Sequence, residues 1–373
     1  MNLYVSRSTQ TSTDVLLAVG LASLFVSAGC DPSETTIREY GPFYEVTLPD
    51  GPYRRCSPLQ TTTDYRMEDR LATRQAFYER MQTLASRSPE GIRTWRLSEG
   101  LDWPGRFLDQ YLALLHFSAA RLFDSVVSRW NSLDESQQGW HLDLLQSLFS
   151  APFRDLEEGE QTQKRWKAYA QEQAIIDPAE VNALQVLNPS QGKGANRAKA
   201  DGNVQFRQMK SFWLIEFLKF VGFFSGAITL RVTDGSEDYK LYVPGFVACT
   251  MMSFHSIIEE VRELCWSTTP IKQDIRVVAH LARHHAGGSV FVTHYKHMKS
   301  YIVLGTYQLP LSRRQSLLRV AERLDETKGE ERRLLQSCRD ALADDNEKYL
   351  AFASSYGVWL SSHPDRACLT IEL

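Results

Sequence analysis

Side chains that could bind nucleic acid are concentrated between Asn188 and Lys210. The segment holds a single acid, Asp201, and five cations: Lys193, Arg197, Lys199, Arg207 and Lys210. It also holds three amides that can hydrogen-bond to base edges or phosphate: Asn188, Gln191 and Asn196. Three glycines let a backbone approach a ligand closely: Gly192, Gly194 and Gly202. This composition predicts a local nucleic-acid contact, and an ordinary solvated loop is the alternative.

A second concentration of polar chemistry consists of histidines: His280, His284, His285, His294 and His297. His280 and His284 are four residues apart, a spacing that metal ligands on one helix face use. The zinc-hydrolase pattern needs a glutamate directly after the first histidine, whereas Leu281 stands there and no nearby carboxylate completes a site. We interpret the cluster as a basic surface at a helix end. A metal-dependent enzyme of nucleic-acid metabolism using His280–His297 is the alternative.

Three cations close to these histidines could add nucleic-acid contacts: Arg283, Lys296 and Lys299. Other catalytic patterns are missing from the sequence. Gly192-Lys193 lacks the serine or threonine that follows the lysine of a phosphate-binding loop, because Gly194 stands there. The chain has no His-Asp dipeptide and no G-x-S-x-G sequence. We therefore expect a protein that is not an enzyme and that carries no metal ion or cofactor.

The overall composition limits how this chain could bind nucleic acid. It has 373 residues, 23% of them charged, and a formal net charge of −3. A protein that coats nucleic acid by bulk charge is usually strongly basic, so a contact here must be local, with the remaining surface open to protein partners. The six cysteines are far apart, which argues against a zinc ribbon or a dense disulfide framework and favours a cytoplasmic protein.

The N-terminal part is expected to be a small α/β segment, residues 1–60. Strands are predicted at Leu3–Val5 and at Thr36–Leu48, the second around Gly41-Pro42. Between them, Thr13 or Asp14 is expected to cap a buried helix over Val15–Phe25. A signal peptide is the alternative for this apolar run, but Asp14 has the wrong charge for its start and the run is too short to span a bilayer.

The following residues, 61–310, are expected to form a mainly helical central domain. Helical periodicity begins near Thr63 and continues in several segments: Phe107–Trp130, His141–Phe149, Gln161–Gln173, Phe206–Phe224, Thr250–Trp266 and Ile271–His285. The aromatic residues from Phe212 to Phe224 are interpreted as core rather than as a platform for stacking bases. A hairpin is predicted from Ile228–Val232 and Tyr239–Val243, and further strands at Phe291–Val292 and Tyr301–Tyr307.

Residues 311–373 are expected to form a C-terminal bundle of short helices within Ser312–Leu360. The fold class is therefore α+β, mainly α: a small β-containing N-terminal part, a helical middle with a hairpin, and a helical bundle. Two arginine pairs could contact phosphate: Arg54 with Arg55, and Arg313 with Arg314. A solvated surface with ion pairs is the alternative for both.

One ordered set of motifs resembles a known family. The set comprises Asn188-Pro189, Gln191-Gly192-Lys193-Gly194, Asn196, Lys199-Ala200-Asp201-Gly202, the block from Phe212 to Gly222 and the strand Tyr239–Val243. Together they resemble the large subunit of type I CRISPR effector complexes (Cascade), in the I-A, I-B and Myxococcus-like group. The resemblance covers about the central third of the chain.

The resemblance implies a non-catalytic subunit that caps the complex near the 5′ end of the guide RNA. Such a subunit recognises a short target-adjacent motif in double-stranded DNA, promotes R-loop formation and supports recruitment of a helicase-nuclease or a transposition protein. Its partners would be guide RNA, target DNA and the backbone, 5′-end-capping and small subunits, with no membrane. The C-terminal bundle would lie beside the small subunits. A protein-only scaffold is a further alternative.

Overall fold

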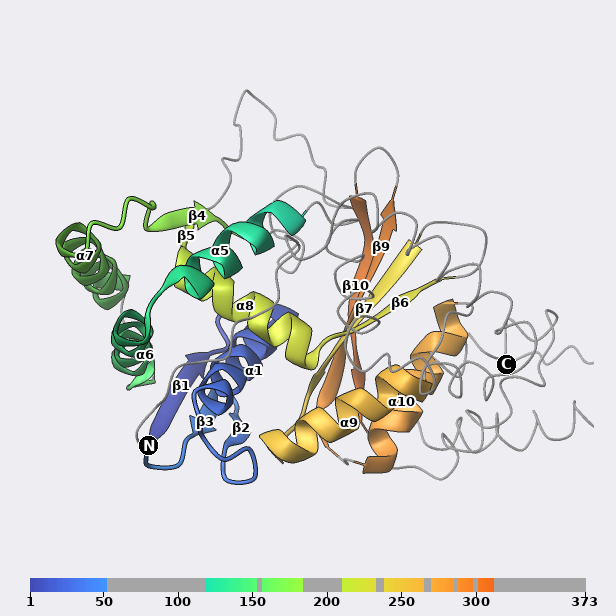
Figure 1. Ribbon diagram of the computed structural model, residues 1–373. Coiled ribbons are helices and arrows are strands. Elements are labelled where there is room, and N and C mark those ends of the chain that lie inside the picture. Colours follow the sequence, from blue (N-terminus) through green and yellow to red (C-terminus); the bar gives the residue numbers. More distant parts are fainter. Residues whose placement is uncertain are drawn as a thin grey trace, which may run out of the picture.

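The computed structural model describes residues 1–51, 119–152, 156–183, 210–232, 238–264, 270–284, 287–297 and 301–311. These residues form helices and antiparallel sheets, with more helix than strand (Figure 1). The prediction of an α+β, mainly α fold is therefore confirmed. The helices expected after Thr63, the first part of Phe107–Trp130 and the C-terminal bundle lie outside the described residues, as does the expected domain boundary near residue 60.

The N-terminal sheet has the strand order β1-β3-β2-β8, with every neighbouring pair antiparallel. Its strands are β1 (Asn2–Ser6), β2 (Thr36–Tyr40), β3 (Phe43–Thr47) and β8 (Ala248–Thr250). Alternate residues such as Leu3, Val5 and Val46 are buried, because successive side chains of a strand point to opposite faces. The single strand predicted at Thr36–Leu48 is in fact two strands, since the chain reverses between Tyr40 and Phe43.

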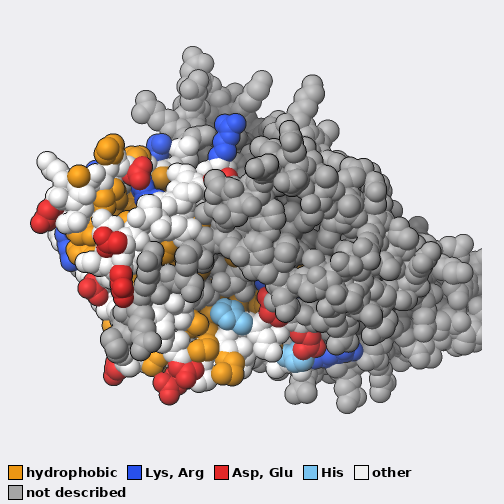
Figure 2. Space-filling model, viewed as in Figure 1, with side chains coloured by type: hydrophobic (Ala, Val, Ile, Leu, Met, Phe, Trp, Pro, Cys, Tyr) orange, Lys and Arg blue, Asp and Glu red, His pale blue; other side chains and the backbone are white. Residues whose placement is uncertain are grey.

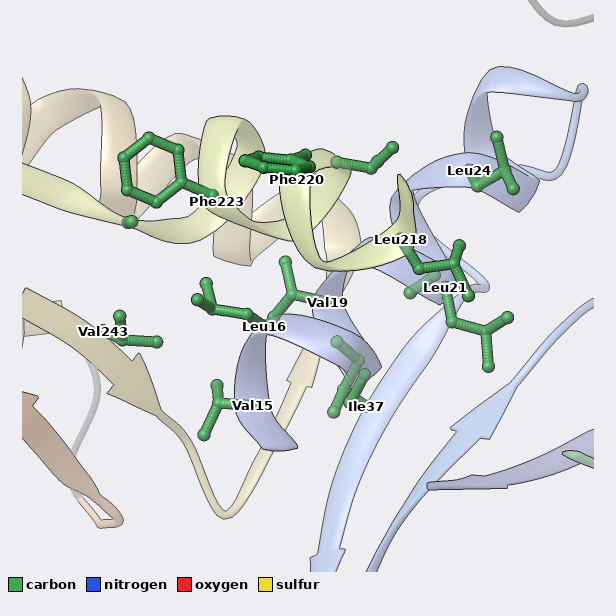
Figure 3. Close-up of a cluster of buried hydrophobic side chains, with 14 of the residues drawn as sticks. Val15, Leu16, Val19, Leu21, Leu24, Ile37, Leu218, Phe220, Phe223 and Val243 are labelled. Carbon is green, nitrogen blue, oxygen red and sulfur yellow. The ribbon is translucent and has the colours of Figure 1, made fainter. Parts of the chain in front are cut away.

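Two apolar helices cross at the centre of the molecule: α1 (Ser12–Ser27) and α8 (Trp213–Gly226). Thirteen of the sixteen residues of α1 are buried, as expected of a helix that is apolar almost all round. Figure 3 shows Leu16 and Val19 of α1 beside Phe220 and Phe223 of α8. Among the described helices, none combines the length and hydrophobicity needed to cross a bilayer.

Glycines allow the two helix backbones to touch. A Cβ atom added at Gly20 would lie 1.9 Å from the carbonyl oxygen of Leu218, and one added at Gly222 would lie 1.9 Å from that of Leu16. Side chains at either position would therefore force the helices apart.

The cap of α1 differs from the prediction. Thr11 is the N-cap residue, and its hydroxyl accepts a hydrogen bond from the Thr13 amide at 3.3 Å. Asp14 instead turns back toward the preceding loop, where it accepts from the amides of Gln10 at 2.8 Å and Thr9 at 3.2 Å. The chain enters the helix earlier than expected because these contacts order residues 9–11 ahead of the apolar run.

The central sheet has the strand order β10-β9-β7-β6. Its strands are β6 (Ile228–Arg231), β7 (Asp238–Gly245), β9 (Ser289–His297) and β10 (Tyr301–Pro310). The predicted hairpin is confirmed, because Ile228 pairs with Tyr242 and Arg231 with Tyr239. All eight residues of β7 are buried, since α1 contacts β7 and so does α10 (Pro270–His284). The strand predicted at Phe291–Val292 is longer, because its whole length pairs with β10.

The remaining helix next to the central sheet is α9 (Met251–Leu264), which also contacts α8. Arg262 joins these two helices: its guanidinium donates to the carbonyl oxygens of Phe224 at 2.8 Å and Ala227 at 2.6 Å. Those carbonyls lie at the C-terminal end of α8, where helical carbonyl groups lack partners within the helix and a cation is favourable.

Three helices lie on the other side of α8: α5 (Ala120–Ser132), α6 (Glu135–Phe149) and α7 (Leu156–Glu172). Two short strands, β4 (Glu180–Asn182) and β5 (Lys210–Phe212), pair beside them. The helix predicted over Phe206–Phe224 is therefore wrong at its start, because residues 210–212 form a strand and α8 begins at Trp213. Pairing with β4 takes up the backbone groups that a longer helix would have used.

We expect Gly20→Ala or Gly222→Ala to destabilise the protein by about 3 kcal/mol, the upper part of the usual range for overpacking, since the new methyl group meets a backbone carbonyl rather than a movable side chain. Urea unfolding followed by tryptophan fluorescence measures the change. Gly139→Ala is the matched control, because nothing lies within 4 Å of a Cβ there, and it should stabilise α6 by about 0.5–1 kcal/mol. Equal effects at Gly20 and Gly139 would contradict the close helix contact.

Candidate nucleic-acid interface

The paired strands β4 and β5 form a ribbon from which the cationic segment extends. Asn182 lies opposite Lys210, Val181 opposite Ser211 and Glu180 opposite Phe212. The ammonium of Lys210 also donates a hydrogen bond to the Asn182 side chain at 2.8 Å. Residues 183–209 connect these two strands, so the ribbon holds the two ends of this connection side by side; the predicted nucleic-acid-binding segment lies within the connection and ends at Lys210.

The ribbon is joined directly to the core through Trp213, the first residue of α8. Its backbone amide donates to the Ala179 carbonyl at 3.0 Å. This bond continues the pairing of β4 and β5 into the two arms of the ribbon's base, the residues just before β4 and just after β5. The Trp213 indole is fully buried and packs against the rings of His141 at 5.5 Å and Trp166 at 6.2 Å between centroids. The base of the ribbon is therefore fixed by an aromatic cluster that links α6, α7 and α8.

The prediction that the aromatic residues from Phe212 to Phe224 are core is confirmed, with Phe224 partly buried against that core. Phe212, Phe217 and Phe223 are at most 5% exposed, which leaves no ring face for a nucleic-acid base. The polar helix predicted at Gln161–Gln173 also contributes to the core, since Trp166 of α7 is only 1% exposed. Tyr169 of the same helix stacks on Trp140 of α6, with the ring centroids 3.8 Å apart.

His141 is the polar centre of the aromatic cluster. Its Nδ1 hydrogen-bonds to the Gln137 carbonyl at 2.6 Å, and its Nε2 accepts from the Trp166 indole at 3.0 Å. These partners suit a neutral imidazole that carries its proton on Nδ1. Burial lowers the pKa of His141 to about 4, so the ring stays neutral well below physiological pH.

The described residues include three of the predicted nucleic-acid contacts. Lys210 is exposed on β5, Arg283 is exposed in the last turn of α10, and Lys296 lies near the far end of β9 from Ser289. The structure does not bring these three together: β5 and α10 lie on opposite sides of α8 (Figure 1). The other predicted contacts lie outside the described residues: Asn188, Gln191, Lys193, Asn196, Arg197, Lys199, Arg207, Arg54, Arg55, Lys299, Arg313 and Arg314.

The visible face in Figure 2 shows how charge is distributed over the described residues. Lys and Arg side chains are scattered there among acidic ones and do not gather into a patch. This distribution agrees with the low net charge of the chain. No protein-family model and no curated protein matches this chain.

The structure describes the side chains of three of the predicted histidines: His280, His284 and His294. His284 pairs with Glu260 at 2.9 Å, and the Nε2 of His294 lies 3.5 Å from Asp238. Burial lowers the pKa of His280 to about 4, so this ring does not contribute to the basic surface predicted at the helix end. Within the described ranges, no three His, Cys, Asp or Glu side chains are placed to hold a metal ion.

A buried ionic network that the sequence analysis missed joins α10 to the central sheet. The Lys240 ammonium on β7 donates to Asp274 of α10 and to the Tyr307 hydroxyl, both at 2.7 Å. The hydroxyls of Tyr242 and Tyr307 donate to the two carboxylate oxygens of Asp274 at 2.8 and 2.7 Å. Lys240 and Asp274 are at most 2% exposed, so removing either side chain would leave the charge of the other buried without a counter-ion.

We expect Asp274→Asn to destabilise the protein by about 3–5 kcal/mol, because it leaves the Lys240 ammonium buried without its counter-ion. Urea unfolding at neutral pH measures the loss. The double variant K240M/D274L should recover part of the stability, since it removes both charges, although the Tyr242 and Tyr307 hydroxyls lose the carboxylate that accepts from them. A D274N protein that unfolds within about 1 kcal/mol of the parent would contradict the network's importance.

The protein should lose stability as the pH falls from about 6.5 toward 4, because the unfolded chain protonates His141 while the folded protein keeps the ring neutral. Above pH 6.5 the contribution is fully present; at pH 5 about 2 kcal/mol is lost. The measurement compares unfolding free energies at pH 7.5 and 5 for the parent and His141→Gln. The variant should have the smaller difference between the two pH values. An identical pH dependence in both proteins would exclude this role.

Proposed function

We propose that this chain is the non-catalytic large subunit of a type I CRISPR RNA-guided surveillance complex (Cascade). In that role it recognises the target-adjacent motif in double-stranded DNA, promotes R-loop formation and supports recruitment of a nuclease or a transposition protein. The sequence support is the ordered motif set from Asn188 to Val243. The structural observation that favours it is the β4–β5 ribbon, which holds the two ends of the 183–209 connection together at the start of α8.

The ribbon matters because binding residues act best on a loop whose ends are held by a rigid scaffold. Closing the ends of a chain of this length has an entropic cost, and the pairing of β4 with β5 meets that cost before any ligand binds. Lys210, at the end of the ribbon, is exposed and donates a hydrogen bond to the neutral side-chain amide of Asn182, which leaves its charge available for a phosphate contact.

The proposed roles follow from the side-chain chemistry. Lys193, Arg197 and Lys199 contact phosphates, which gives affinity without sequence preference. Asn188, Gln191 and Asn196 contact base edges, which gives preference for one motif. Guide RNA then reads the target by base pairing, while the protein reads only the short flanking duplex.

A low net charge fits a subunit that touches DNA over a small area and docks on other proteins over a larger one. The partners in this role are the backbone, 5′-end-capping and small subunits, together with guide RNA. The main competing role is a protein-only scaffold, in which the cationic segment contributes nothing to DNA affinity. The two roles differ in the outcome of one binding experiment.

We expect the triple variant K193A/R197A/K199A to weaken binding of target DNA by the assembled complex on the order of 100-fold at moderate salt. The slope of log affinity against log salt should become shallower by about 2 to 3, because three phosphate contacts no longer release counter-ions. Titrations of labelled duplex at several salt concentrations measure both quantities.

The matched control removes three exposed cations from α5 and α7 instead: Arg121, Lys164 and Lys167. It changes net charge equally and should leave affinity and salt slope unchanged. In a second arm, Asn188→Ala and Asn196→Ala should narrow the affinity difference between preferred and altered motifs. Unchanged binding in the triple variant and in the asparagine variants would favour the scaffold role.

A further inference from the structure

One buried guanidinium contacts both arms of the ribbon's base. Arg129, in the last turn of α5, is 9% exposed. Its Nε donates to the Asp177 carboxylate at 3.2 Å, and its Nη1 donates to the Pro178 carbonyl at 2.9 Å. Its Cζ lies over the Trp213 ring, 4.8 Å from the centroid, and over the Trp166 ring at 5.7 Å.

These contacts join two places that are far apart in the sequence. Asp177 and Pro178 lie on the arm that enters β4, whereas Trp213 directly follows β5. The strand β5 is held by its covalent continuation into α8, whose first residue is fully buried. The arm before β4 follows α7 at a distance of seven residues, 173–179, rather than joining a helix directly, and Arg129 supplies an anchor for it.

Arginine is suited to this position. Its planar fork donates to a carboxylate and a carbonyl while its face stacks on an indole, which a lysine cannot do. Burial lowers the pKa of Arg129 and the Asp177 hydrogen bond opposes that change, so the side chain keeps its charge at a desolvation cost. The Arg129 guanidinium is therefore held by two hydrogen-bond acceptors and two aromatic rings, which fix its position at the base of the ribbon.

We propose that Arg129 is a positioning residue for nucleic-acid binding: it holds the β4 arm against Trp213 and so fixes the two strands between which the cationic segment runs. This inference rests on the proposed function. Arg129 itself does not contact DNA in this role. By fixing the β4 arm before DNA binds, Arg129 lowers the entropic cost of binding. This raises the affinity and leaves the number of phosphate contacts in the bound state unchanged.

The test measures DNA binding by the assembled complex containing Arg129→Met, at a temperature well below its unfolding midpoint. We expect an affinity loss of at least about tenfold with the salt slope unchanged, because the number of phosphate contacts stays the same. Asp177→Ala is the second variant, useful if R129M does not fold; Asp177 is 58% exposed, and the substitution removes one of the partners of Arg129. It should give a smaller loss of the same kind.

A cross-strand disulfide provides the rescue. Val181 and Ser211 are register partners, and antiparallel partners have Cα separations within the range that a disulfide bridges. In the R129M background, V181C/S211C should restore affinity when oxidised and lose it again on reduction, since the bridge ties β4 to the anchored β5. Gly139→Ala in the same background is the control: it stabilises α6 without tying β4 to β5, and should not restore affinity.

The outcomes separate this inference from the proposed function. R129M that binds DNA like the parent, while K193A/R197A/K199A binds weakly, overturns the role of Arg129 alone. Rescue by G139A as efficient as by the oxidised bridge also overturns it, because general stability would then explain the loss. No loss in the triple variant overturns the proposed DNA-binding segment, whatever Arg129 does.

Discussion

The close crossing of α1 and α8 is the constraint on which the rest of the structure depends. Gly20 and Gly222 bring the two backbones together, with Leu16 and Leu218 supplying the facing carbonyls. A separation of even one methyl group would shift α8 relative to the N-terminal sheet on one side and the central sheet on the other. The first 51 residues and the described residues between Lys210 and Leu311 therefore share one core, and β8 completes the N-terminal sheet from far along the chain.

The position of the proposed interface follows from this crossing. Because α8 begins directly after β5, the place where the ribbon leaves the core is set by where α8 lies. Trp213 anchors one arm by its burial, and Arg129 with Asp177 holds the other arm against it. A chain of contacts thus runs from the glycine crossing to the two ends of the cationic segment.

Charge is used in two different ways in the described part of the protein. Lys240 and Asp274 are buried against each other, and their geometry fixes α10 on the central sheet. Arg129 is buried as well, but it joins chain segments at the edge of the core. Neither cation is available to a ligand, so the nucleic-acid contact that we propose depends on exposed cations such as Lys210 and on the segment between the two strands of the ribbon.

The sequence by itself determined the elements whose signal is local. The apolar runs around Leu16 and Phe220 specified buried helices, and the two strand-forming runs Ile228–Val232 and Tyr239–Val243 specified a hairpin, because both signals lie within a few neighbouring residues. It also placed the cations of the candidate site between Asn188 and Lys210, though with a helix start that was wrong by several residues. That error arose because Lys210–Phe212 has no strand pattern of its own.

Only the tertiary structure decided which distant residues meet. The ribbon depends on two three-residue strands separated by residues 183–209, too short for any periodicity to reveal. The pairing of Lys240 with Asp274 and the stacking of Arg129 on Trp213 bring together residues more than thirty positions apart. Such contacts form because buried charges and donors must find partners wherever the fold places them, and a sequence pattern does not record that placement.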